Sequence, residues 1–311
     1  MILDIVWIVI GLATLIVGGE FLVKGAVGMA TKARLSTLVI GMTVVSFGTS
    51  APELLVSLKA AYHDVPEIAI GNVIGSNIAN IALVLGLTVI IFPMPVSRNS
   101  LIFDWPIMML ASILFVVFSF NLQIERIEGV VLFTILVGFI YFLIRNSRKN
   151  KKSKETNDLD EVIKVNVFKS VGFILIGLIG LYFGAKWLIE GAKSLGESAG
   201  LSKHVIAITI VAFGTSVPEL VTSVVAAYRK EMDISVGNLI GSNIFNIMLV
   251  IGLTAIVSPI RVDESVVRWD MIWMLAIALI LLPMMWYKRK IGRISGIILL
   301  TAYFVYIYLL F

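Results

Sequence analysis

The 311-residue chain contains no cysteine, only two histidines and few charged residues. Without cysteine it can form neither a disulfide nor a thiolate metal site, and it has no cysteine nucleophile. His63 and His204 are both expected in short loops, which leaves little room for a zinc centre or a histidine-based catalytic triad. Charged residues make up 14% of the chain and hydrophobic residues 59%, whereas about a quarter of a soluble domain is charged. The composition excludes a soluble enzyme and a disordered chain, and it predicts an integral membrane protein whose partner is the lipid bilayer, not nucleic acid.

Long apolar runs without alternating polarity predict membrane-spanning helices and not a β-barrel. We expect ten spans, at about residues 5–28, 36–61, 67–92, 104–120, 127–145, 167–193, 203–228, 234–258, 268–286 and 293–310. The first run has no basic segment before it and is therefore expected to be retained as a span, not cleaved as a signal peptide. The fold class is all-α and polytopic.

The distribution of lysine and arginine predicts the orientation of these spans. If the N-terminus lies outside the cell, 18 of the 25 basic residues lie in inner loops, including Arg98, the 145–169 stretch and the basic residues of 288–293. Both termini are then extracellular, and the polar 146–166 linker is cytoplasmic and solvated. The predicted location is the plasma membrane.

The chain contains an internal repeat. Residues 47–62 recur at 213–228 with eleven of 16 positions identical, and residues 71–80 recur at 237–246 at the same offset. The repeat divides the chain into a first half (1–145), the 146–166 linker and a second half (167–311), with five spans in each half. Because five is odd, the second half enters the membrane from the opposite side, so the repeats are inverted. Secondary transporters use this arrangement to place an ion site near the membrane midplane.

Two glutamates lie deep in predicted spans, one in each repeat copy. Glu53 and Glu219 directly follow Pro52 and Pro218, and each proline removes a backbone donor and bends its helix. A structural carboxylate that stays protonated is the alternative, but an ionisable group at bilayer depth normally marks a functional site. We therefore interpret both glutamates as ion ligands.

Other polar residues in the spans separate into two groups. Ser76 and Asn80, like Ser242 and Asn246, are four residues apart and share one helix face, so they line a pathway or bond to neighbouring helices. The pairs Glu20–Lys24 and Lys186–Glu190 have the same spacing, and we expect them to be intrahelical ion pairs that support the structure. The Gly71–Gly75 and Gly237–Gly241 spacings indicate close helix packing.

These side chains offer oxygen ligands only. Carboxylate, hydroxyl, amide and freed carbonyl oxygens suit Ca²⁺, whereas transition metals prefer imidazole or thiolate. Two ionised glutamates carry a charge of −2, which one Ca²⁺, two Na⁺ or two protons would neutralise. Competition for one site is a natural mechanism of antiport.

The motifs at 47–53, 213–219, 71–77 and 237–243 resemble the α-repeats of the calcium/cation antiporter superfamily, and the similarity is strongest to prokaryotic sodium/calcium exchangers. The resemblance implies ten helices in which the kinked helices 2, 3, 7 and 8 form a central ion site, while helices 1 and 6 slide across the rest. It implies a Ca²⁺ site of Glu53, Glu219, Thr49 and Thr215, completed by Asn80 and Asn246. It also implies Na⁺ ligands at Ser46, Thr49, Ser50, Ser76, Ala212, Thr215, Ser216 and Ser242.

Two departures accompany this resemblance. Many members have Asp where this chain has Asn246, so its central site has one carboxylate fewer, which leaves the ion stoichiometry open. The 146–166 linker is too short for the regulatory domains of animal exchangers. The expected function is Ca²⁺/Na⁺ exchange without an enzyme activity, a cofactor or an obligate protein partner. Alternatives are H⁺-coupled cation antiport and, less favoured, a passive cation channel or an intramembrane enzyme.

Overall fold

The computed structural model describes residues 2–152, 166–199 and 212–310, and these are almost entirely helical. Its contacts divide the chain into two compact units. Unit 1 comprises residues 1–49 and 143–237, and unit 2 comprises residues 50–142 and 238–311. Each unit therefore contains segments from both halves of the sequence.

The described residues of unit 1 form helices and one π-helical segment. They are α1 (Ile2–Ala33), α2 (Thr37–Ile40), the π-helical η1 (Gly41–Val45), α3 (Ser46–Thr49), the end of α8 (Arg126–Lys152), α9 (Val167–Ser198), α11 (Ala212–Thr215), α12 (Val217–Tyr228) and the start of α13 (Met232–Phe245).

Unit 2 contains the remaining helices and four very short strands. Its helices are α4 (Ala51–Tyr62), α5 (Ile68–Ile78), α6 (Gly86–Ile91), α7 (Trp105–Ser119), most of α8, the end of α13, α14 (Gly252–Val257), α15 (Met271–Trp286) and α16 (Arg293–Leu309). Its π-helical segments are η2 (Ala79–Leu85), η3 (Ser100–Asp104), η5 (Asn246–Ile251) and η6 (Val266–Asp270), and η7 (Tyr287–Arg289) is a 3₁₀ turn. Its strands are β1 (Met94–Pro95), β2 (Gln123–Ile124), β3 (Ile260–Arg261) and β4 (Lys290–Ile291).

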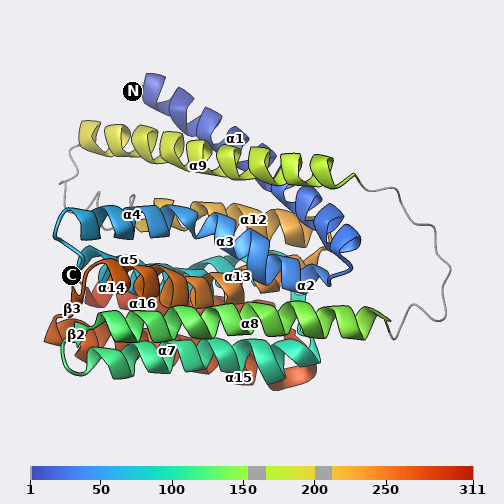
Figure 1. The fold of residues 1–311 in the computed structure, drawn as a ribbon. Coiled ribbons are helices and arrows are strands. Elements are labelled where there is room, and N and C mark those ends of the chain that lie inside the picture. The colour runs from blue at the N-terminus through green and yellow to red at the C-terminus, as the bar shows by residue number, and fades with distance from the viewer. Residues whose placement is uncertain (1, 153–165, 200–211, 311) are drawn as a thin grey trace. The chain divides into compact units, whose positions relative to one another are not determined.

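Two long antiparallel helices dominate unit 1. Helices α1 and α9 lie side by side (Figure 1), and glycines at every seventh position of each face the other's backbone. These glycines are Gly11, Gly18 and Gly25 in α1 and Gly177, Gly184 and Gly191 in α9. A Cβ at Gly18 would lie 2.8 Å from the backbone nitrogen of Leu181, and one at Gly177 would lie 2.6 Å from that of Leu22. The two backbones are therefore in direct contact, as in other small-residue membrane interfaces.

Helix α12 packs against both of these helices, and it also contacts α3. The chain enters α2 through Ser36, whose side chain accepts a hydrogen bond from the Val39 nitrogen. The Ser36 nitrogen itself donates to the Ser147 Oγ at 2.8 Å. Ser147 thus connects the end of α8 to the start of α2 by satisfying a donor in this cap.

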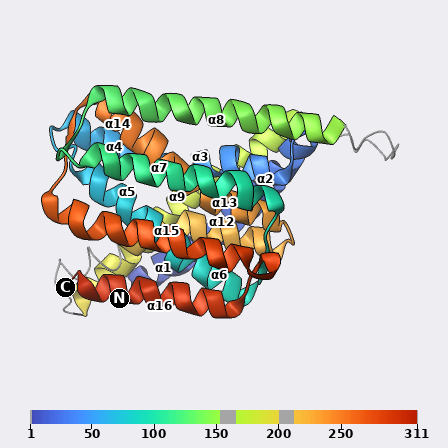
Figure 2. The same ribbon diagram turned by 90° about the horizontal axis from the view of Figure 1, so that it is seen from below.

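The interior of unit 2 is formed by α5 with η2 and by η5 with α14, where most side chains are buried. Helix α15 contacts α5 and α7, and α16 contacts α6 and η2 (Figure 2). Two antiparallel two-stranded sheets link distant parts of the chain: β1 pairs with β4, with Met94 opposite Ile291, and β2 pairs with β3, with Gln123 opposite Arg261.

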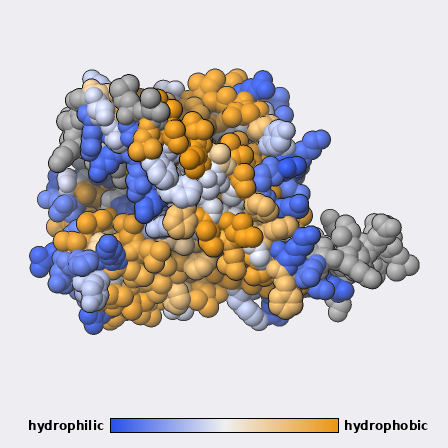
Figure 3. Space-filling view, turned by 90° about the horizontal axis from the view of Figure 1, so that it is seen from above, coloured by the Kyte–Doolittle hydropathy of each residue, from blue (hydrophilic) through white to orange (hydrophobic). Residues whose placement is uncertain are grey.

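The outward faces of these helices suit a lipid environment. Hydrophobic side chains occupy the middle of the face seen in Figure 3, and hydrophilic ones gather towards its ends. Exposed apolar residues occur along α1 and α9 in unit 1 and along α7, α8, α15 and α16 in unit 2. Because exposed apolar side chains at this density are stable only in lipid, the chain is a multi-pass membrane protein.

Helices lie at all ten expected spans in the part of the chain that the structure describes, but not all are long enough to cross a membrane. Seven continuous segments are long and apolar enough, and the broken pair Thr37–Thr49 and Ala51–Tyr62 gives an eighth. The two remaining positions have the shorter apolar helices Val217–Tyr228 and Arg293–Leu309. Residues 203–211 of the seventh expected span lie outside the described residues. The ten-span count thus stays a prediction.

Helix α8 differs from expectation at its end. The apolar run predicts that the fifth span ends at 145 and that a solvated linker follows from 146, whereas α8 is helical to Lys152. The hydrogen bond of Ser147 explains part of this extension, because it gives the extra turn a partner at the start of α2.

Candidate ion-binding site

Each repeat copy breaks its helix at the serine of the Thr-Ser-x-Pro-Glu motif. Helix α3 ends at Thr49, Ser50 has φ −85° and ψ 2°, and α4 begins at Ala51. The second copy is the same: Ser216 has φ −91° and ψ 0° between α11 and α12. Pro52 and Pro218 lie in the first turn of the new helices, where a missing N–H costs nothing. The prolines therefore start new helices, whereas the sequence analysis placed them inside bent ones.

Glu53 lies in the first turn of α4, and its side chain is only 2% exposed. Neither of its carboxylate oxygens has a hydrogen-bond partner among the residues that the structure describes. A helix N-terminus carries a partial positive charge from its free N–H groups, which favours a carboxylate there. This favourable contribution is smaller than the hydration free energy that a carboxylate loses when it is buried. Glu53 is therefore suited to bind a cation or a proton.

Glu219 occupies the matching position in α12. It lies in the first turn of that helix and is 1% exposed. Both glutamates are therefore buried, as their sequence positions predict, and both lie at a helix N-terminus, which the sequence does not predict. Glu53 belongs to unit 2 and Glu219 to unit 1.

Unit 2 contains buried polar residues from both repeats in helices that contact α4 or adjoin those that do. Helix α4 contacts α5, η5 and α14, and α5 contacts η5. The predicted ligands in these segments and their immediate neighbours are all buried: Ser50, Ser76, Asn80, Ser242 and Asn246. Within the described part of the chain, the Ser50 hydroxyl and both polar atoms of the Asn80 amide have no hydrogen-bond partner. Asn80 lies in π-helical η2 and Asn246 begins η5, and such segments occur often at functional sites.

An asparagine network fixes the amide of Asn246. Its Nδ2 donates to the Asn77 Oδ1 at 3.1 Å, and Asn77 donates to the Asn243 carbonyl at 3.4 Å. The Asn243 Nδ2 donates in turn to the Leu239 carbonyl at 2.7 Å. The Asn246 Oδ1 has no partner among the described residues, so the network leaves an oxygen acceptor available for a cation.

Sequence reasoning missed the role of Asn72. Its Nδ2 lies 3.3 Å from both the Glu53 carbonyl and the Ser57 Oγ, so it connects α5 to the first turns of α4. Asn72 is the asparagine of the first Gly-Asn-x-Ile-Gly-Ser-Asn motif, and its presence in both motif copies was the available signal.

The other predicted ligands lie in unit 1, in segments that contact α12 or directly precede it. Helix α12 contacts α3, which contains Ser46 and Thr49, and it follows α11 and Ser216. Ser46, Thr49 and Ser216 are buried, and Thr215 is half-buried. Ser46 donates to the Gly41 carbonyl at 2.8 Å. Ala212 was predicted to contribute its carbonyl, and it begins α11.

The structure gives Glu20 a partner other than the expected Lys24. The Arg229 guanidinium donates to both Glu20 oxygens, from Nε at 3.0 and 2.9 Å and from Nη2 at 2.6 Å. Hydrogen bonding to Glu20 and its charge raise the pKa of Arg229. Lys24 lies 5.4 Å from the centre of the Phe173 ring in a cation–π contact. The sequence could not reveal this pair, because the contact between α1 and the end of α12 is tertiary. Lys186 and Glu190 do form their intrahelical pair, at 3.9 Å.

The chemistry of this region is that of oxygen ligands. Within the described residues, no group of three or more His, Asp or Glu side chains could hold a metal. Each unit instead combines one buried glutamate with buried hydroxyls, and in unit 2 the predicted ligands Asn80 and Asn246 add their amides. Such a ligand set fits hard cations that accept neutral oxygens, such as Ca²⁺ and Na⁺.

Comparison with known proteins agrees with this chemistry. Residues 3–145 and 169–311 match the family described as sodium/calcium exchanger protein. The chain is 32% identical to the sodium/calcium exchanger MaX1 of Methanosarcina acetivorans, over 98% of this chain and 97% of that one. It is also 32% identical to the inner membrane protein YrbG of Escherichia coli, over 100% and 98%.

A solved structure is similar over the whole length. The sodium-calcium exchanger NCX_Mj, soaked with zero Na⁺ and Ca²⁺, is 34% identical and superimposes with a TM-score of 0.85, covering 100% of this chain and 99% of that one. With both halves matched and the whole length covered, the chain belongs to the sodium/calcium exchanger protein family.

Proposed function

We propose that the protein is a secondary antiporter that exchanges Ca²⁺ for Na⁺ by alternating access. The observation that carries this proposal is the buried glutamate in the first turn of a broken helix, present once in each half of the chain. Such a carboxylate attracts cations, and a single pair cannot satisfy two kinds of ion at once. Family membership supports the same activity.

In this proposal, Glu53 and Glu219 share one central Ca²⁺ with Thr49 and Thr215, and Asn80 and Asn246 complete the site. Inverted repeats bring the two broken helices together near the membrane midplane, as in other secondary transporters. Two carboxylates neutralise one Ca²⁺, which offsets much of the cost of holding both charges in lipid.

The proposed Na⁺ sites flank this centre. Their ligands are hydroxyl and carbonyl oxygens, which suit a monovalent cation because they add no further charge. The proposed ligands are Ser46, Thr49, Ser50, Ser76, Ala212, Thr215, Ser216 and Ser242.

The proposed topology has ten spans in two inverted repeats of five. The short apolar helices at 217–228 and 293–309 complete the seventh and tenth spans. Both termini are extracellular and the 146–166 linker is cytoplasmic, because this orientation places 18 of 25 basic residues inside.

Proton coupling is the second candidate. Two protons neutralise the glutamate pair as well as one Ca²⁺ does, and Asn246 supplies an amide where many exchangers have a carboxylate. Compared with exchangers that have the carboxylate, this site has one negative charge fewer and balances less cation charge when ions are bound. This favours a different ratio of exchanged ions or a different coupling ion.

The experiment is ion flux in vesicles that contain the purified protein. Vesicles loaded with Na⁺ are expected to take up Ca²⁺ when the outside is Na⁺-free, including when the membrane potential is clamped at zero. If Ca²⁺ uptake depended on a pH gradient and not on Na⁺, the coupling ion would be H⁺ and not Na⁺. Ca²⁺ flux without any counter-ion requirement would indicate a channel and contradict antiport.

Glu53→Gln and Glu219→Gln test the shared site. Each removes one charge with little change of shape, so each is expected to lower exchange by about 100-fold or more, equivalent to roughly 2.7 kcal/mol. The matched control is Glu67→Gln, because Glu67 is exposed and its side chain does not cap α5. Normal exchange in either variant of the buried glutamates, with the protein folded, would contradict the shared site.

A further inference from the structure

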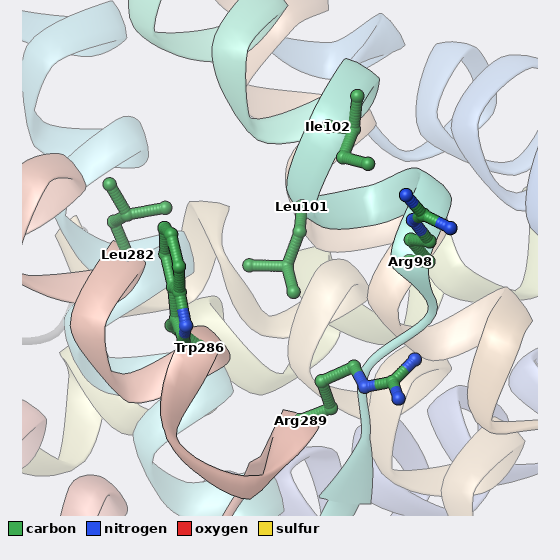
Figure 4. A pocket seen from close by; sticks show the side chains of 6 residues that line it. All are labelled: Arg98, Leu101, Ile102, Leu282, Trp286 and Arg289. Atoms are coloured by element: carbon green, nitrogen blue, oxygen red, sulfur yellow. The ribbon is translucent and has the colours of Figure 1, made fainter.

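A cavity of about 360 Å³ lies in unit 2, between η3 with the residues before it and the end of α15 with η7. It is lined by Arg98, Leu101, Ile102, Leu282, Trp286 and Arg289. Figure 4 shows the two arginines on one side of the cavity and Leu282 and Trp286 on the other. The cavity therefore has a cationic side and an apolar side.

Local backbone contacts hold the two arginines beside the cavity. The Val96 nitrogen donates to the Arg289 carbonyl at 2.8 Å, next to the β1–β4 pair, in which Pro95 lies opposite Lys290. Arg289 has a φ of 48°, in the left-handed region that side chains disfavour. On the other segment, the Ser100 nitrogen donates to the Ser97 Oγ at 3.0 Å and fixes the turn that contains Arg98. These contacts thus hold the backbone at Arg98 and Arg289 beside the cavity.

No carboxylate balances these charges. Segments 93–100 and 286–293 together contain five basic residues and no acidic one. Neither Arg98 nor Arg289 has an ion-pair partner within the residues that the structure describes. The cavity is therefore electrostatically prepared for an anion.

The apolar side continues into a neighbouring hollow of similar volume. That second hollow is lined by Leu282, Pro283, Trp286 and Tyr287, so Leu282 and Trp286 border both. Trp286 is 73% exposed and Tyr287 69%, as is typical of aromatic residues at the lipid–water interface. An occupant would thus have its charge at the arginines and its chains along the leucines and aromatic rings.

We propose that this cavity binds the headgroup of an anionic phospholipid, with the phosphate at Arg98 and Arg289 and an acyl chain along Leu282 and Trp286. Arginine suits a phosphate because its guanidinium can donate two parallel hydrogen bonds. Basic pockets between membrane helices bind such headgroups. In the proposed orientation, this end of α15 faces the cytoplasm, where anionic lipids are enriched. The lipid site does not depend on which ion is exchanged.

The test measures thermal unfolding of the purified full chain with short-chain lipids. Dioctanoyl phosphatidylglycerol is expected to raise the unfolding temperature by about 2 °C or more beyond the effect of dioctanoyl phosphatidylcholine. Glycerol 3-phosphate, which has the phosphate but no chains, is expected to give a much smaller shift. An equal shift with glycerol 3-phosphate would mean a free-phosphate site and would overturn the lipid proposal.

The double variant Arg98→Gln, Arg289→Gln is expected to weaken phosphatidylglycerol binding about tenfold or more, because it loses two charge-assisted contacts. The matched control is Arg261→Gln, an exposed arginine in β3, outside both basic segments. Unchanged phosphatidylglycerol binding in the double variant would overturn the proposal.

Native mass spectrometry of the wild-type chain gives an independent measure if the double variant does not fold. Retention of phosphatidylglycerol over phosphatidylcholine is expected in a mixture of the two, and equal retention would overturn the proposal.

Discussion

At the scale of single residues, the energetics centre on the buried carboxylate of Glu53. A carboxylate removed from water is costly unless hydrogen bonds or a counter-charge replace its solvation. The first turn of α4 supplies the positive end of a helix dipole, worth about 0.3–1 kcal/mol at exposed sites and up to about 2 kcal/mol when partly buried. That is too little to hold an isolated charge at this depth, so a cation or a proton must supply the rest.

The burial of Glu53 and Glu219 at matching positions could be predicted from the sequence, because a charge inside an apolar run, repeated at one offset, is visible without a structure. Their roles as ion ligands stay predictions. The contacts of Asn72 and the Asn77–Asn246 hydrogen bond could not be predicted. Both depend on which helix face meets which neighbour, and a polar residue inside a span only indicates that some partner exists. The ligand roles of the hydroxyl residues remain predictions for the same reason.

Asn72→Ala is expected to weaken ion exchange by about fivefold to tenfold, because Asn72 positions the first turns of α4 without contributing a charge. The loss of its two hydrogen bonds is expected to destabilise the protein by about 1–3 kcal/mol. Flux measured against Ca²⁺ concentration and thermal unfolding together check this prediction. Asn99→Ala serves as the control, since Asn99 is exposed. If Asn72→Ala behaved like the control, the positioning role would be wrong.

At the scale of elements, the positions of most helices follow from apolar runs, but their internal irregularities do not. The π-helical η2 and η5 lie within spans that the sequence predicts as uniform α-helices. Hydrophobic composition does not distinguish an i→i+5 hydrogen bond from an i→i+4 one. The helix breaks at Ser50 and Ser216 were partly predictable from the prolines that follow them. Proline is tolerated in the first turn of a helix but not in its interior, which explains why each break lies just before the proline.

Gly18→Ala is expected to destabilise unit 1 by about 1–3 kcal/mol, because the new Cβ would lie 2.8 Å from the Leu181 nitrogen in α9. Gly138→Ala is the matched control: this glycine also lies inside a helix, α8, and nothing lies within 4 Å of its Cβ position. Because alanine favours helices, the control is expected to be neutral or stabilising by up to about 1 kcal/mol. Thermal unfolding distinguishes the two, and equal effects would contradict the backbone contact between α1 and α9.

At the scale of the whole molecule, the sequence repeat and the compact units divide the chain differently. The repeat separates residues 1–145 from 167–311, whereas each unit takes segments from both halves. A repeat records similarity along the chain, and packing depends on which helices meet in space. The inverted relation of the repeats therefore stays a prediction.

The absence of cysteine permits a direct test of the proposed topology, since single cysteines can be introduced without removing native ones. Ser153→Cys in the linker is expected to react with a membrane-impermeant maleimide only after the cells are opened. Asn121→Cys, in the exposed segment after α7, is expected to react in intact cells. The reverse pattern would invert the proposed orientation.

The ion pair between Glu20 and Arg229 has a mechanical consequence for the molecule. It attaches α1 to the C-cap residue of α12, the helix that has Glu219 in its first turn. Lengthwise displacement of α1 by a helical turn must therefore break the attachment or pull on the segment that bears this carboxylate. The bridge therefore couples the position of α1 to that of α12, the helix that carries the buried Glu219.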